Sequence, residues 1–285
     1  MTPWFVRGLR EGIVTTHYPR GTDPYERDFP AAVTVRPAAP RVTRAELGGL
    51  CPTGALDAAP DGTPRLDRGR CVLCRRCVRV RPDVFAPASG AATAAVARAA
   101  LVVPGAVEDE AAVAALRARL AARTARFRRS LHIRHVDAGS DGSDEWEIAA
   151  LVNPVYDIHR LGMFLTASPR HADVLIVTGA GARGMAAPLR RTYEATARPV
   201  VVIAAGTDAC SGGMWAGTYA THSGIGGLLD VDIWVPGSPP SPFSLLQALL
   251  LATGRLGRAD REPPDRKPPD GGTADGGTAE GGRGE

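Results

Sequence analysis

The chain has few of the residues on which several classes of protein depend. Only five of its 285 residues are cysteine, which excludes a secreted scaffold held together by disulfides. Aromatic residues make up 5%, too few for a protein that binds single-stranded nucleic acid by stacking. Its purely apolar runs, such as 200–205 and 248–252, fall well short of the ~20 residues that span a membrane. A globular chain remains, because the 44% of apolar residues can form a sizeable core.

Lysine is also nearly absent, since Lys267 is the one lysine among 34 basic residues. The net charge of +4 therefore reflects a general use of arginine, beside much alanine, glycine and proline, and we expect no nucleic-acid partner. The start of the chain lacks the basic-then-apolar pattern of a signal peptide. Together with the few cysteines, this predicts a reducing, cytoplasmic setting. Any membrane contact is expected to come through a partner, with no direct span.

Composition divides the chain into five segments, and its length is typical of two domains. Residues 1–40 are polar, show no clear period and are predicted to be an N-terminal extension. Residues 41–90 hold four of the cysteines, and residues 91–130 form an Ala- and Arg-rich helical linker. Residues 131–257 are predicted to be the larger domain. Residues 258–285, rich in Pro and Gly, are expected to be a disordered tail.

Short apolar runs alternate with helical patterns in the larger domain. Continuous apolar strands that alternate with helices predict a parallel sheet covered on both faces. In such sheets the chemistry lies in the loops after the carboxyl ends of the strands. Strands are expected at 131–136, 173–178, 200–205 and 230–236. Helices are expected at 110–129, 145–152, 183–196 and 243–253.

Four of the cysteines follow the spacing of an iron–sulfur protein. Cys71, Cys74 and Cys77 form a C-x₂-C-x₂-C run, and Cys51 is followed by proline upstream. In two-cluster bacterial ferredoxins each motif is C-x₂-C-x₂-C-x₃-C-P, and the fourth cysteine of one motif binds the other cluster. Soft thiolates are the ligands that such clusters need. The four cysteines are therefore the complete ligand set for one [4Fe–4S] cluster.

The ligand set of the second ferredoxin cluster is missing as a whole. Its four positions hold Arg41, Arg44, Leu47 and Arg81. Random loss of four of the eight cysteines would leave one set intact in about one arrangement in thirty-five. A zinc site is the alternative, because it also uses C-x₂-C spacing. The third cysteine and the Cys-Pro pair favour iron and sulfur.

Residues 8–86 resemble the ferredoxin-type subunit of complex I and of the membrane-bound [NiFe] hydrogenases, including formate hydrogenlyase. The segments EGIVTTHYPR at 11–20, CPTGAL at 51–56 and CVLCRRC at 71–77 carry this resemblance. It implies a small α+β domain of the bacterial ferredoxin type before the larger domain.

The larger domain resembles the small subunit of the same complexes, the 20 kDa subunit family of the NADH-quinone oxidoreductases. The resemblance is carried by VDAGS at 136–140, NPVYDIHRLGM at 153–163, SPRHADVLIVTG at 168–179, GTDACSGG at 206–213 and VDIWVPGSPP at 231–240. It implies a flavodoxin-like parallel sheet that holds one further [4Fe–4S] cluster near the interface with a large, catalytic subunit.

The residues at the positions of that proximal cluster depart from the family. The resemblance places its ligands at Asp141, Asp144, Asp208 and Ser238, and none of these is cysteine. Cys210 lies two residues past Asp208 and cannot replace four thiolates. We therefore expect no standard cluster there. Two interpretations stay open: the three aspartates bind a hard cation through oxygen, or polar side chains fill a vacated cavity.

These features predict an electron-transfer or structural subunit, non-catalytic itself, of a complex I-like or membrane-bound hydrogenase-like oxidoreductase. Its expected cofactor is one [4Fe–4S] cluster. The resemblance implies a large subunit and membrane-arm subunits as partners, a quinone nearby in the assembly, and a place on the cytoplasmic face of the cell membrane. The alternative is a stand-alone soluble electron carrier or redox sensor that uses the same four cysteines.

Overall fold

The larger domain is built on a parallel five-stranded sheet. The computed structural model describes residues 3–21, 23, 29, 31–105, 110–124 and 130–256. The strands lie in the order β10-β9-β8-β6-β7, and every neighbouring pair is parallel. Their bounds are β6 Leu131–Asp137, β7 Met163–Leu165, β8 Val174–Thr178, β9 Val201–Ala205 and β10 Ile233–Val235. We call residues 130–256 the α/β domain; its sheet confirms the predicted parallel architecture.

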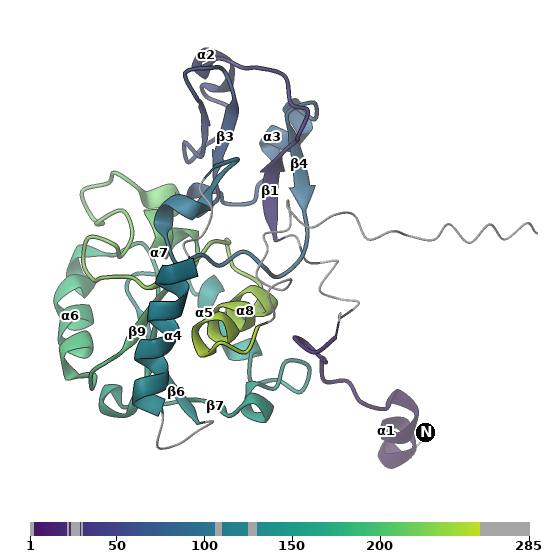
Figure 1. Ribbon diagram of the computed structural model, residues 1–285, viewed down its shortest axis with the longest axis vertical. Coiled ribbons are helices and arrows are strands. Elements are labelled where there is room, and N and C mark those ends of the chain that lie inside the picture. Colours follow the sequence, from purple (N-terminus) through teal and green to yellow (C-terminus); the bar gives the residue numbers. More distant parts are fainter. Residues whose placement is uncertain are drawn as a thin grey trace, which may run out of the picture.

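Helices cover both faces of this sheet because its strands are apolar on both sides. In β8, Val174 and Ile176 join one core cluster, while Leu175 and Val177 join the other. The first cluster lies under α4, α5 and α8, and the second under α6 (Figure 1). The helices are α4 Glu110–Thr124, α5 Ser143–Ala150, α6 Ala186–Ala195, α7 Thr207–Ser211 and α8 Pro242–Thr253.

The predicted elements of this domain are found within a few residues of their expected bounds. The expected strand at 230–236 is shorter, at Ile233–Val235. The linker helix is described to Thr124, and its expected remainder at 125–129 lies outside the described residues. The edge strand β7 was not predicted, because three residues with one buried side chain give no periodic signal. The last helix is well bounded: Ser241 caps its start and Gly254, at φ 70°, ends it.

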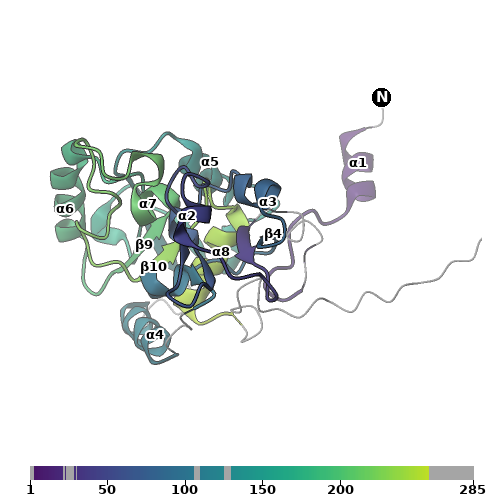
Figure 2. The same ribbon diagram turned by 90° about the horizontal axis from the view of Figure 1, so that it is seen from above.

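Four of the five cysteines lie in a separate α+β unit, residues 31–90, which we call the cysteine module. It stands on the α/β domain at the end near α7 (Figures 1 and 2). Its β1 and β4 form an antiparallel pair, and β2 and β3 form a second sheet with β5. The elements of the module are β1 Ala32–Val35, α2 Arg44–Leu47, β2 Leu56–Ala58, β3 Pro64–Asp67, α3 Arg76–Val80 and β4 Phe85–Ala88; β5 Val102–Val103 belongs to the segment that follows.

The described part of the first forty residues contains two elements that the sequence analysis did not predict. Strand β1 lies within them and belongs to the cysteine module, so the module begins before residue 41. A helix, α1 Trp4–Glu11, also lies there. Two helical turns and four strand residues are too short to show a period by composition, which explains why both were missed.

Residues 91–105 connect the two units and pair with both. Ala95 exchanges backbone hydrogen bonds with Trp234 of β10, while β5 pairs with β3. Across the described ranges, no helix is both long enough and apolar enough to cross a bilayer. The tail expected at 258–285 lies outside the described residues.

Candidate functional site

The four cysteines of the predicted cluster set gather at one place in the cysteine module. Cys71 and Cys77 are buried in the core of the module, and Cys51 packs against that core. Cys74, which is exposed, lies between them in the loop. The other three thiols lie close enough to Cys71 to raise its pKa. The structure therefore brings together the residues that the sequence assigned to a single ligand set.

The backbone near these thiols turns sharply and directs hydrogen-bond donors at two of the sulfur atoms. Leu73 and Arg75 take up left-handed conformations, at φ 52° and 56°, so that the loop curls around its own cysteines. The backbone of Leu73 is hydrogen-bonded to the Cys71 sulfur. The N–H group of Ala55 donates to Cys51 Sγ at 3.3 Å. Donors aimed at sulfur are among the protein features that tune iron–sulfur clusters.

Burial governs the chemistry of the two inner thiols. It raises the pKa of Cys71 to about 12, although the hydrogen bond with Leu73 opposes the shift. Burial also raises the pKa of Cys77, and the neighbouring thiols add to the effect. Without a cationic centre these thiols keep their protons at neutral pH. A soft, positively charged iron centre would convert them to thiolates, so the donor set fits the predicted cluster.

The four cysteines are not arranged as ligands of a single metal ion. In the parts of the chain that are described, no three His, Cys, Asp or Glu side chains are placed to hold a single metal ion. In a four-iron cluster each cysteine binds a different iron, so the four sulfurs do not meet at one point.

The Cys71 loop is fixed directly to the α/β domain. Thr207, the first residue of α7, donates its hydroxyl to the carbonyl oxygen of Cys71 at 2.9 Å in a buried contact. The same hydroxyl accepts from the N–H group of Gly237 at 3.3 Å. Gly237 precedes Ser238, and Asp208 follows Thr207. The cysteine loop therefore rests against the segments that carry two of the replaced ligand positions.

A second polar contact strengthens this junction. Arg98 holds both carboxylate oxygens of Asp67 at 2.8 Å and donates to the carbonyl oxygen of Cys210 at 3.3 Å. Its guanidinium lies so close to Gly69 that a Cβ atom there would approach within 2.6 Å. This one side chain links the connecting segment, the cysteine module and α7.

Replacing Arg98 by leucine should weaken the junction because Asp67 would lose its partly buried partner. We expect a loss of about 2 kcal/mol in the free energy of unfolding, the usual range for charged hydrogen bonds. Urea unfolding measures it, with Arg98→Lys as the control, which keeps the charge and loses the two-pronged geometry. An unchanged unfolding midpoint in Arg98→Leu would contradict this role.

The replaced ligand positions lie at the carboxyl edge of the sheet. Asp144, only 5% exposed, packs on the backbone of Gly206, where a Cβ atom would come within 2.3 Å of its carboxylate. Asp208 lies over Gly213 in the same way. Asp141 is exposed and accepts hydrogen bonds from its neighbour Ser143, and Ser238 is exposed. The aspartates are near one another but do not form a group that would hold an ion, as far as the described residues extend.

Burial raises the pKa of two of these aspartates, Asp144 and Asp208. Burial raises the pKa of Asp144 to about 8, and the charges of Glu145 and Asp208 add to the shift. Burial raises the pKa of Asp208 to about 6, with a contribution from Asp141. Hydrogen bonds from Ser143 lower the pKa of Asp141. At neutral pH Asp144 is therefore mainly protonated and Asp208 mainly ionised, so both interpretations of the replaced site, a hard cation or polar side chains that fill a cavity, stay open.

A polar network that the sequence did not predict lies beside this cavity. Glu145 accepts hydrogen bonds from the hydroxyls of Ser140, at 2.7 Å, and Thr178. His135 Nε2 lies 2.9 Å from the Thr178 hydroxyl and 3.3 Å from Glu145. Burial lowers the pKa of His135, against the pull of Glu145. Its members come from β6, the following loop, α5 and β8, so no sequence spacing could reveal it.

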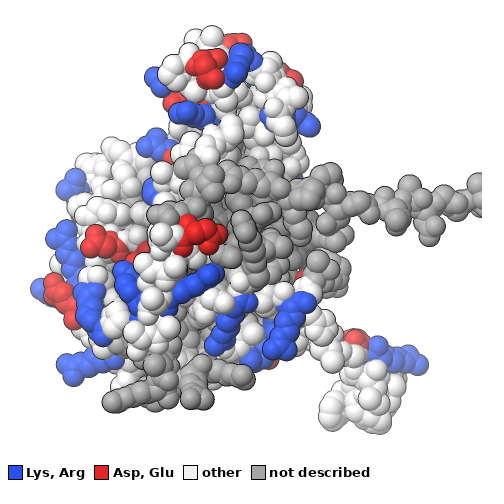
Figure 3. Space-filling model, in the orientation of Figure 1, with Lys and Arg blue, Asp and Glu red and all other residues white. Residues whose placement is uncertain are grey.

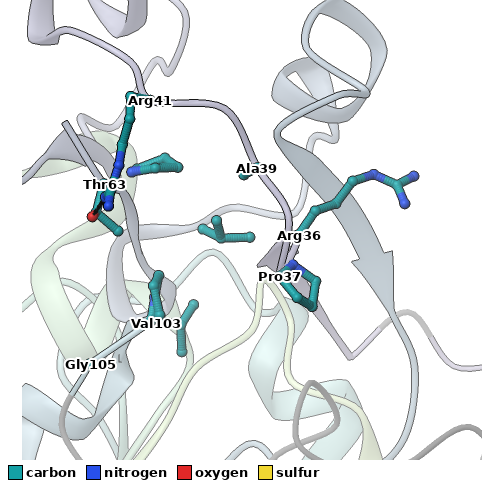
Figure 4. A pocket seen from close by; sticks show the side chains of 10 residues that line it. Arg36, Pro37, Ala39, Arg41, Thr63, Val103 and Gly105 are labelled. Carbon is teal, nitrogen blue, oxygen red and sulfur yellow. Dashed lines mark hydrogen bonds between the residues drawn. The ribbon is translucent and has the colours of Figure 1, made fainter.

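A separate pocket of about 540 Å³ opens between β1, β3 and β5 (Figure 4). Its two charged side chains are engaged: Arg36 donates to the carbonyl oxygen of Pro82 at 2.7 Å, and Arg41 pairs with Asp61 at 3.0 Å. The other lining residues are mostly Val, Pro and Ala, with no thiol or carboxylate among those described. The pocket is therefore distinct from the cysteine site and offers no catalytic group.

Comparison with known proteins identifies the family of the α/β domain. The family model of the NADH ubiquinone oxidoreductase 20 Kd subunit matches residues 142–252. A protein of Pyrococcus furiosus named "Probable membrane-bound hydrogenase subunit mbhJ" is 36% identical over 130 residues, which are 46% of this chain and 78% of the relative. The chain belongs to this 20 kDa subunit family. The predicted resemblance of the larger domain is thereby confirmed.

Two further comparisons describe how much of the chain is matched. Formate hydrogenlyase subunit 7 of Escherichia coli is 35% identical over 131 residues, 46% of this chain. The matched part spans only about half of that relative, 51% of its length. A chain of the archaeal membrane-bound sulfane sulfur reductase is 24% identical, with a TM-score of 0.40, covering 47% of this chain and 76% of that chain. The family match begins at residue 142, so the ferredoxin-like nature of the cysteine module stays a prediction.

Proposed function

We propose that this protein is a subunit of a complex I-like or membrane-bound hydrogenase-like oxidoreductase that carries one [4Fe–4S] cluster in its cysteine module. Cys51, Cys71, Cys74 and Cys77 would hold it. When bound, the cluster would supply a one-electron redox centre. The observation that carries the proposal is the gathering of these four thiols in one region of the cysteine module, where Thr207 fixes the Cys71 loop to the α/β domain.

The 20 kDa domain itself acts as a scaffold in this proposal. Its positions for the proximal cluster hold the aspartates and Ser238, and the buried Asp144 is a neutral acid at neutral pH. Oxygen ligands of this kind do not suit an iron–sulfur cluster. The chain would therefore end an electron path at the cysteine module, or use its cluster to stabilise the fold. It would not pass electrons on through a proximal cluster in the α/β domain.

An apolar surface around the replaced site supports a protein partner. Trp146 of α5, two residues after Asp144, is 78% exposed. Met214 and Trp215 directly follow Gly213, on which Asp208 packs, and both are 58% exposed. Exposed tryptophan and methionine are typical of interface cores. This face would receive the large subunit. The relatives named as membrane-bound hydrogenase and formate hydrogenlyase subunits suggest membrane-arm subunits as further partners, and the name of the NADH ubiquinone oxidoreductase family suggests a quinone in the assembly.

Co-purification from the native cells tests this proposal against the alternative of a soluble carrier or redox sensor. We expect a tagged chain to come from the membrane fraction, at the cytoplasmic face, with a hydrogenase-like large subunit and membrane-arm subunits. Trp146→Glu should lower recovery of the large subunit at least about tenfold, because it puts a charge in the core of the interface. Recovery of the chain alone from the soluble fraction would favour the carrier.

A further inference from the structure

The N-terminal helix α1 has two chemically different sides. At 3.6 residues per turn, its apolar side chains Trp4, Phe5, Val6 and Leu9 fall on an arc of about 200°. Arg7, Arg10 and Glu11 occupy the remaining arc. Tryptophan, phenylalanine and leucine opposite arginine, in a helix of low average hydrophobicity, are typical of helices that lie in a membrane interface.

Nothing in the described part of the chain covers this apolar side. None of the helix residues is buried; Trp4 is 86% exposed and Leu9 is 81% exposed. Ile13, just after the helix, is 80% exposed. Figures 1 and 2 both show α1 standing away from the body of the molecule. In Figure 3 its surface is mainly white, with charge confined to its upper side.

The segment after α1 is firmly attached to the α/β domain. Thr16 donates its N–H group to the carbonyl oxygen of Val155 at 2.8 Å. Tyr18 is buried against the ring of Phe243, and Arg160 donates to the Tyr18 carbonyl oxygen at 2.7 Å. The helix is thus held at a defined place on the protein, so whatever it binds lies beside the α/β domain.

We propose that α1 is an interfacial anchor that inserts its apolar side directly into a bilayer containing anionic lipid. Arg7 and Arg10 would face the anionic headgroups, while Trp4 and Leu9 would enter the acyl boundary. The charge is complementary, since residues 3–21 hold three arginines against one glutamate. This goes beyond the proposed function, in which partners alone hold the chain at the membrane. Because so short a helix binds a bilayer weakly, contacts with those partners supply the rest of the anchoring.

Flotation of the full-length chain with lipid vesicles tests the anchor. We expect binding to phosphatidylcholine vesicles that contain about 30% phosphatidylglycerol, and weaker binding to pure phosphatidylcholine. Raising the salt to about 0.5 M should reduce the bound fraction, because it screens the arginines. Trp4→Glu/Leu9→Glu should lower the bound fraction at least about tenfold. These substitutions touch no buried side chain, so the unfolding midpoint should not change.

A matched control removes an exposed tryptophan elsewhere. Trp215→Glu should bind vesicles like the unchanged chain. The proposal is wrong if the unchanged chain does not float, if the double variant floats equally well, or if Trp215→Glu loses binding to the same extent. If the chain does not bind vesicles but α1 can be crosslinked to a membrane protein, the proposal is overturned, and α1 instead binds a groove of that protein. Flotation needs no iron, so its failure is distinct from a failure of the cluster proposal.

Discussion

Replacing Cys71 by alanine should abolish iron binding and unfold the cysteine module. The core of this module is small and built largely from valine, leucine and alanine, with the thiols of Cys71 and Cys77 inside it. A cluster would cross-link the 71–77 loop to Cys51, which lies twenty residues before it in the sequence. Structural metal sites supply on the order of 10 kcal/mol to the folding of small units. We expect iron to fall to background and residues 41–86 to become open to proteolysis, while the α/β domain stays folded.

The fifth cysteine provides the control for this experiment. Cys210 is buried in the α/β core, and its sulfur lies 4.0 Å from the carbonyl oxygen of Ala204. Cys210→Ala should cost about 1 kcal/mol for the small cavity and leave the iron content unchanged. Full iron content in Cys71→Ala, or loss of iron in Cys210→Ala, would contradict the ligand assignment.

Replacing Asp144 by asparagine should raise the free energy of unfolding relative to the unchanged protein, and this gain should grow with increasing pH. Burial holds the pKa of Asp144 at about 8 in the folded chain, whereas an unfolded aspartate has a pKa of about 3.9. Between these values the folded state binds one more proton than the unfolded state, so its free energy of unfolding falls with increasing pH. The slope is about 1.4 kcal/mol per pH unit. Asparagine has the same shape and cannot ionise, so the free energy of unfolding of the variant does not fall with pH for this reason.

The gain from Asp144→Asn should be larger at pH 8 than at pH 5 by on the order of 4 kcal/mol. Urea unfolding at several pH values measures it. Asp141→Asn is the control: hydrogen bonds from Ser143 lower the pKa of Asp141, so its substitution should bring no gain with increasing pH. A gain from Asp144→Asn that does not grow with pH would contradict the account. Destabilisation by Asp144→Asn at pH 8 would indicate that a cation holds the carboxylate ionised.

The sheet was predictable because its strands are apolar on both faces. β8 and β9 each show five consecutive buried residues, which no surface element produces. The edge strand β7 and the helix α1 were not predictable, since a few residues show no period. The N-terminal strand β1 was missed for the same reason, although it completes the cysteine module.

The grouping of the four cysteines in one region was predictable from their spacing, whereas their surroundings were not. The contact between Thr207 and Cys71 joins residues 136 positions apart, and the pair of Arg98 and Asp67 joins different units. Polar contacts of this range leave no trace in local composition. The burial of Asp144 was equally hidden, because aspartate is common in glycine-rich turns and its environment is set by Gly206, which follows another strand.

Counting iron and sulfide in the anaerobically purified chain, with electron paramagnetic resonance of the reduced protein, tests the central claim most directly. The account predicts about four irons and four sulfides per chain and the signal of a single [4Fe–4S] cluster. Roughly eight or more irons would show that the replaced positions still hold a second cluster. A chain that contains zinc, or no metal, would contradict the assignment of Cys51, Cys71, Cys74 and Cys77.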